Sequence, residues 1–164
     1  MATDPGDLRG GFRSSRRFVG WQTFFDFGGS HSADVRPNKQ IDTVLSTPLF
    51  ALPTSAIAHI PGDPGPVALP QRTLLRHLTW SLPSGQAVAR RLHVPRLSHT
   101  DLSDLASYGY DLDRSTPLWL YVLREAQLVN DGQFLGPVGG RIVAEVMLGL
   151  LLADPSSYLA GKPR

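Results

Sequence analysis

Five histidines are the side chains best suited to binding a metal or moving a proton near neutral pH. They are His31, His59, His77, His93 and His99. The nearest pair, His93 and His99, lies six residues apart with Pro95 between, which fits neither a helical i, i+4 metal pair nor a zinc finger. Cysteine is absent, which excludes thiolate catalysis and cysteine-bound metals. We therefore predict no metal site and no catalytic residue.

Two other segments have some features of catalytic motifs but lack the parts that matter. Ser84 in the segment Leu82–Gln86 is not framed by the glycines of a nucleophile elbow, so the segment is better explained as a turn leading into a helix. The glycine-rich segment Gly136–Arg141 follows no strand and has neither a Walker lysine nor the dinucleotide-binding spacing. We predict neither a serine nucleophile nor a phosphate-binding loop.

Glu145 is the more informative polar residue, because it interrupts the apolar run Ile142–Ala153. We expect that run to form a buried helix, in which an unpaired ionised carboxylate would be costly. The predicted partner is Arg141 at i−4, or Arg114 or Arg124 from a neighbouring element. No second titratable group is placed by the sequence to work with Glu145, so a structural ion pair is preferred over acid–base chemistry.

Helices are the elements expected to position these residues. Proline is tolerated in the first turn of a helix, and four prolines precede helical patterns. They predict helices over 70–80, 83–92, 117–129 and 137–153. A shorter helix is predicted over 98–107, with Ser98 or Thr100 as its N-cap and Asp101 and Asp104 near its positive end.

The remaining segments are expected to be mostly irregular. We predict a short helix over 41–50, a Pro/Gly loop over 61–66 and little regular structure over 1–40. Within that first segment, Trp21, Phe24 and Phe25 would share one face of a helical turn and serve as a packing anchor. No strand pattern is present, so the predicted fold is mainly α, with 1–164 as one partial domain and 70–159 as its helical core.

Composition excludes several classes of function. The net charge of +2 arises within the first forty residues and suits a solvated arm, so we predict no nucleic-acid binding. The longest apolar run is shorter than the ~20 residues of a membrane helix, and the polar start lacks a signal-peptide pattern, so a cytoplasmic product without a membrane span is expected. With 41% hydrophobic and 18% charged residues, the chain has the composition of a protein that lacks a partner surface.

Several stretches, in order, resemble bacterial members of the animal-type haem peroxidase family, within the peroxidase–cyclooxygenase superfamily. The similarity spans Asp7 to Leu159 and corresponds to the C-terminal part of that family's domain. The stretches are Trp21–Phe27 with Ile41–Phe50, Leu69–Arg76 running into Leu82–Arg90, and Thr116–Glu125 with Leu135–Glu145.

The resemblance implies a mainly α domain that binds haem between a distal helix, with histidine and arginine, and a proximal histidine. In the family both precede the part that matches this chain, so the resemblance implies no catalytic residue here. Arg76 matches a family arginine near a haem propionate. Thr73 stands where the family usually has an asparagine that hydrogen-bonds the proximal histidine.

Three hypotheses follow. In the first, the chain is part of a peroxide-reducing oxidoreductase, of the kind used in the response to oxidative stress, and is inactive alone. In the second, it is a helical subunit that completes a split haem peroxidase, with a second polypeptide supplying the haem-ligating half. In the third, it is a helical interaction domain unrelated to haem. The first predicts partly uncovered apolar faces on the helices over 70–80, 117–129 and 138–153, which would favour aggregation or association with another polypeptide.

Overall fold

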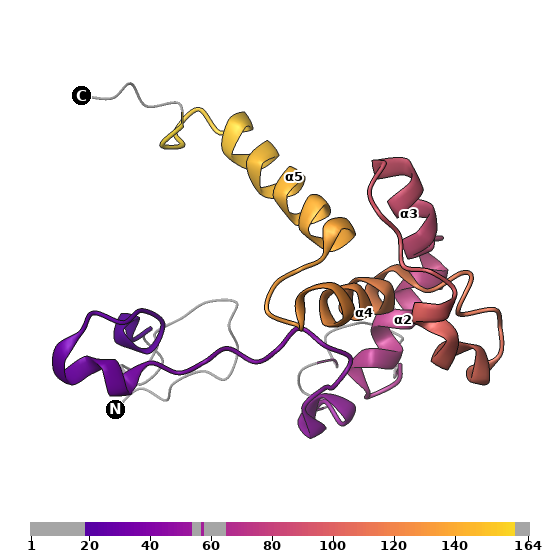
Figure 1. Ribbon diagram of the computed structural model, residues 1–164, viewed down its shortest axis with the longest axis horizontal. Coiled ribbons are helices and arrows are strands. Elements are labelled where there is room, and N and C mark those ends of the chain that lie inside the picture. Colours follow the sequence, from indigo (N-terminus) through magenta and orange to yellow (C-terminus); the bar gives the residue numbers. More distant parts are fainter. Residues whose placement is uncertain (1–18, 54–56, 58–64, 160–164) are drawn as a thin grey trace. The chain divides into compact units, whose positions relative to one another are not determined.

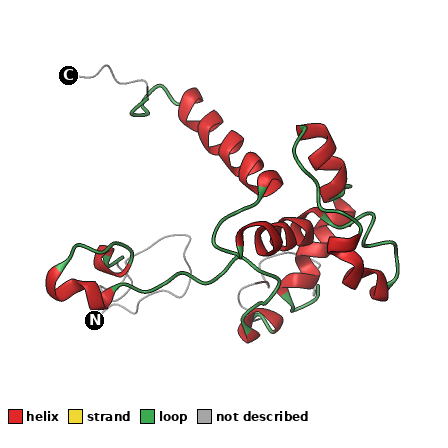
Figure 2. Cartoon of the chain, in the orientation of Figure 1, coloured by secondary structure: helices red, strands yellow, loops and turns green. Residues whose placement is uncertain are grey.

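The computed structural model describes residues 19–53, 57 and 65–159. Helices make up the regular structure of these residues, and no strand occurs among them (Figures 1 and 2). The mainly α class predicted from the sequence is therefore confirmed. None of the described helices is both long and apolar enough to cross a membrane.

The chain divides into two units, Met1–Lys39 and Gln40–Arg164. Within residues 19–39 the first unit contains two short 3-10 helices, η2 (Trp21–Thr23) and η3 (Gly29–Asp34), so the irregular segment expected over 1–40 is largely observed there. The residues before Val19 lie outside the described part of the chain, as does most of the predicted loop over 61–66.

Aromatic rings form a cluster around η2. Trp21 lies 6.4 Å from Phe24 and 6.2 Å from Phe25 between ring centroids, and Phe25 lies 6.3 Å from Phe27. The predicted common face is thus present. The four side chains are 56–66% exposed, so nothing described covers them and the packing role stays a prediction.

Among its described residues, the second unit contains the 3-10 helices η4 (Thr47–Phe50) and η5 (Thr100–Tyr108) and several α-helices. The α-helices are α2 (Leu69–Thr79), α3 (Gly85–Leu92), α4 (Leu118–Asn130) and α5 (Pro137–Ala153). Helices α3, α4 and α5 contact one another, and α2 contacts α4 and η4.

Two of the predicted helix starts need correction. Pro70 and Pro137 lie in the first turns of α2 and α5 as predicted. Pro83 instead precedes the N-cap Ser84, whose Oγ accepts a hydrogen bond from Ala87 N at 3.3 Å, and Pro117 is itself the N-cap of α4. An antiparallel bridge pairs Ser84 with Pro117, and both residues have non-helical backbone, so each helix begins after its bridge residue.

The predicted helix over 41–50 is wrong for most of its length, because only Thr47–Phe50 is helical, as η4. The carboxylate of Asp42 accepts a hydrogen bond from Val44 N at 2.8 Å, a local turn that competes with helix formation.

The helix predicted over 98–107 forms as the 3-10 helix η5 rather than as an α-helix, with His99 in the formal N-cap position. Ser98 nevertheless acts as a capping side chain, because its Oγ accepts from Asp101 N at 3.2 Å while the Asp101 carboxylate accepts from Ser98 N at 2.7 Å. This reciprocal pair is a capping box that satisfies two backbone donors.

The buried core lies between α3, α4, η5 and the start of α5, with Tyr121 of α4 at its centre. Tyr121 is fully buried, and its hydroxyl oxygen accepts a hydrogen bond from Leu97 N at 2.7 Å. Its ring lies directly against Gly85, the first residue of α3, so that an added Cβ there would lie 2.0 Å from Tyr121 Cγ.

Helix α5 departs from the buried helix that the sequence predicts. Val138 and Gly139 are buried at its start, but Val143, Val146, Leu150 and most other residues after the second turn are exposed. The described elements pack only against the first turns of α5, so its apolar composition is not matched by burial.

We predict that Gly85→Ala lowers the free energy of unfolding by about 1–3 kcal/mol, because the new methyl group overpacks against Tyr121. Gly149→Ala is the matched control: its Cβ would meet nothing within 4 Å, and alanine favours the helix by roughly 0.5–1 kcal/mol. Urea denaturation followed by circular dichroism measures both. Equal effects of the two substitutions would contradict the close approach of α3 to Tyr121.

Candidate functional site

Thr73 and Arg76, the residues singled out by the sequence, lie three positions apart on α2 and so share one side of that helix. Thr73 is half-buried, and its hydroxyl donates to the carbonyl oxygen of Leu69 in its own helix at 3.1 Å. Arg76 is exposed and has no ion pair with any described residue. The Arg76 guanidinium is therefore accessible, whereas the Thr73 hydroxyl is used in a hydrogen bond within its own helix.

The opposite side of α2 is apolar. Leu74, Leu75 and Leu78 line a shallow groove of about 340 Å³ together with Pro66 and Gln71. The three leucines are exposed, as is Trp80 at the end of the helix. This leucine face of α2, formed by Leu74, Leu75 and Leu78, is one of the uncovered apolar surfaces that the sequence predicts.

The described histidines occupy four different environments. His31 pairs with Asp34 at 3.2 Å on the surface, and His93 ends α3 with a left-handed backbone at φ 57°. His77 lies next to Arg76 on α2, and its Nδ1 is buried without a hydrogen-bond partner. His99 contacts Asp113 at 2.5 Å. No group of three potential metal ligands gathers among the residues that the structure describes, and His59 lies outside them.

Glu145 has one of its three predicted partners, because it pairs with Arg141 along α5. The expectation of burial is wrong: its side chain is 54% exposed, since α5 is uncovered at this point. Arg124 pairs instead with Asp104 of η5 at 3.1 Å. Glu145 is therefore a surface ion-pair residue.

A carboxylate that is almost completely buried belongs to Glu125 of α4, which is 1% exposed. Its Oε2 accepts hydrogen bonds from Val138 N at 2.9 Å and from Gly139 N at 3.2 Å, both in the first turn of α5. These are backbone donors that a helix cannot satisfy internally, and the positive end of the helix favours a negative charge there. Glu125 thus caps α5 from the neighbouring helix.

Burial raises the pKa of Glu125, and the hydrogen bonds from Gly139 N and Val138 N oppose that rise only in part. Close packing enforces the burial, since a Cβ on Gly136 would lie 2.3 Å from Glu125 Cγ. Sequence reasoning missed this residue. The available signal was its position seven residues after Leu118 and four after Tyr121, on the apolar stripe of α4.

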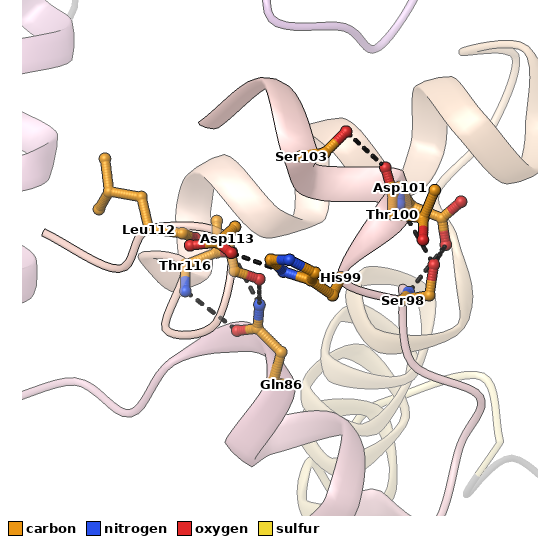
Figure 3. A network of polar contacts seen from close by, with 9 residues as sticks. All are labelled: Gln86, Ser98, His99, Thr100, Asp101, Ser103, Leu112, Asp113 and Thr116. Atoms are coloured by element: carbon orange, nitrogen blue, oxygen red, sulfur yellow. Dashed lines mark hydrogen bonds and ion pairs between the residues drawn. The ribbon is translucent and has the colours of Figure 1, made fainter. Parts of the chain in front are cut away.

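A second set of polar contacts joins α3 to the segment before α4 (Figure 3). The buried Gln86 donates from Nε2 to Thr116 Oγ1 at 2.8 Å and accepts at Oε1 from Thr116 N at 3.0 Å. The same amide donates to the carbonyl oxygen of Asp113 at 3.3 Å, and the Asp113 carboxylate contacts His99. These partners lie up to 30 residues apart, beyond the reach of a local sequence pattern.

Comparison with known proteins identifies no family for this chain. No protein-family model, no curated protein and no solved structure gives a significant match to the chain.

We predict that Glu125→Gln reduces the pH dependence of stability. Because the folded-state pKa of Glu125 is raised, the folded protein holds this proton more tightly, and the free energy of unfolding falls as pH rises from the ordinary glutamate pKa through the raised one. Glutamine removes this fall, which can reach about 1.4 kcal/mol per pH unit. Denaturant unfolding at a series of pH values measures it.

Glu145→Gln is the control, since Glu145 is exposed. Asp26, Asp101 and Asp154 have lowered pKa values. Their contribution to the free energy of unfolding therefore increases as pH rises, opposite to that of Glu125. They are present in both variants, so the difference between the variants isolates Glu125. A pH profile of Glu125→Gln that superimposes on the parent profile would rule out the raised pKa.

Proposed function

We propose that this chain is the C-terminal helical part of an animal-type haem peroxidase domain and that it performs no peroxidase chemistry alone. The observation that carries the proposal is the ordered set of stretches that resemble this family. The later stretches coincide with the packed part of the chain, where they supply Gln86, Thr116, Glu125 and Val138 to the contacts between helices.

The side chains around α2 fit the edge of a haem group and not its iron. Arg76 offers an accessible guanidinium, whose fork of donors suits a propionate. Thr73 donates to Leu69 O, so its hydroxyl is not directed to an axial histidine. We assign Arg76 a contact with the edge of the haem group. We assign this chain neither an axial ligand of the iron nor a step of the reaction.

Uncovered apolar helices support the further proposal that a second polypeptide segment completes the domain. Besides the leucine face of α2, α5 exposes apolar side chains over most of its surface from Val143 onward. These are Val143, Val146, Met147, Leu148, Leu150 and Leu152. A helix that is apolar all round is normally buried in a protein interior. The same surfaces also favour the alternative function, a helical interaction domain unrelated to haem.

We predict that titrating the purified full chain with haemin gives no sharp Soret band and no peroxide-dependent oxidation of a dye. The physical reason is that Arg76 alone provides charge attraction without a bond to iron. Absorption spectra and initial rates are compared with haemin in buffer and with the Arg76→Ala variant. A sharp Soret band with turnover would overturn the proposed inactivity.

We also predict that the isolated chain self-associates and that Leu78→Glu together with Leu150→Glu reduces this association. Both leucines are strongly exposed, and charges placed there interrupt the apolar surfaces. Sedimentation velocity at several concentrations measures the effect. Ser115→Glu with Gln133→Glu, at exposed positions outside both surfaces, adds the same charge and should leave association unchanged.

The split-enzyme hypothesis has a direct test in co-expression with a neighbouring gene product that carries the distal and proximal histidines. Co-purification that is lost in the Leu78→Glu, Leu150→Glu variant, with a sharp Soret band for the intact pair, would support a split haem peroxidase. Co-purification without haem would favour the unrelated interaction domain. A parent chain that sediments as a folded monomer at all concentrations would count against a missing partner.

A further inference from the structure

A cavity of about 410 Å³ is lined in part by residues of the polar contacts in Figure 3, among them Gln86, His99 and Asp113, and by no residue of α2. Its lining comes from α3, from the segment between α3 and η5, and from the turn before α4. The polar residues that matter are Gln86, Arg90, Arg96, His99, Asp113 and Arg114. A cavity of this size falls within the range of small-molecule sites, roughly 300–1,000 Å³.

Charge in this cavity is strongly unbalanced. Arg90, Arg96 and Arg114 each line it, and none of the three pairs with a carboxylate among the described residues. The one acidic side chain in the lining is Asp113, which is 6% exposed and already contacts His99. Three arginines therefore line the cavity against one engaged carboxylate, and the lining carries net positive charge.

The backbone that carries these arginines is held by buried contacts. Gln86 and Arg90 lie four residues apart on the same face of α3, and Gln86 is fixed by its hydrogen bonds to Thr116. Leu97, next to Arg96, donates its N–H to the buried Tyr121 hydroxyl at 2.7 Å.

The turn that carries Arg114 is also well defined. Arg114 N donates to the Asp111 carbonyl oxygen at 2.9 Å, and Tyr110 and Asp111 have left-handed backbone. All three arginines line one cavity from backbone that is held in place, which lowers the entropic cost of binding one ligand between them.

We propose that this cavity binds a small ligand through a dianionic phosphate group. Guanidinium groups bind phosphate oxygens through paired, charge-assisted hydrogen bonds, and a phosphate offers several acceptor oxygens to three of them. The Asp113 carboxylate, the one acidic group in the lining, is already engaged by His99. The group belongs either to free inorganic phosphate or to an organic phosphate monoester.

Calorimetric titration of the full chain with inorganic phosphate and with phenyl phosphate tests the proposal. Arg96→Gln with Arg114→Gln should weaken binding of both probes by about tenfold or more, as expected for loss of charge-assisted contacts. Arg91→Gln is the matched control, because Arg91 is exposed on α3 and does not line the cavity. It should change the dissociation constant less than twofold.

Circular dichroism and thermal unfolding establish that the variants keep the fold. Tighter binding of phenyl phosphate than of inorganic phosphate assigns the site to a monoester, and equal binding assigns it to the free anion. The proposal is overturned if the parent chain binds neither probe, or if Arg91→Gln weakens binding as much as the double substitution. Acetate serves as a monoanion that should bind more weakly than either probe.

Discussion

The hydrogen bonds from the start of α5 to the Glu125 carboxylate are the constraint on which the packing of the last two helices depends. They require a buried acidic group opposite a helix end. They also require that no side chain of α5 or of the residue before it occupy the space next to that group. Gly136 and Gly139 meet that requirement, because a Cβ at either position would lie within 2.6 Å of Glu125 or Val122. The contact between the Glu125 carboxylate and the start of α5, together with the two glycines, therefore fixes the direction of α5 relative to α4.

Side-chain hydrogen bonds also bring distant segments together elsewhere in the second unit. The amide of Gln86 is paired on both sides with Thr116, and the hydroxyl of Tyr121 receives the N–H of Leu97. Each of these groups would be costly to bury unpaired, so the partners stabilise one arrangement over looser ones. Around them the buried apolar cluster is small, which gives these polar contacts a large share in defining the fold.

Sequence reasoning located the helices because proline position and apolar periodicity are local properties, as Pro70 and Pro137 illustrate. It misplaced the starts at Pro83 and Pro117, where a bridge between the distant residues Ser84 and Pro117 accompanies non-helical backbone. It selected Glu145 over Glu125, because burial is decided by which helix packs against which and not by the residues on either side. The haem contact of Arg76 stays a prediction.

Helix α5 is anchored through its first turns while its second half is apolar and exposed. At a rise of about 1.5 Å per residue, residues 143–153 extend roughly 16 Å beyond the anchored turns. Helix α5 is thus a rigid element that is held at one end, next to the buried carboxylate of Glu125. A small rotation at Val138 therefore becomes a larger displacement at the far end of the helix.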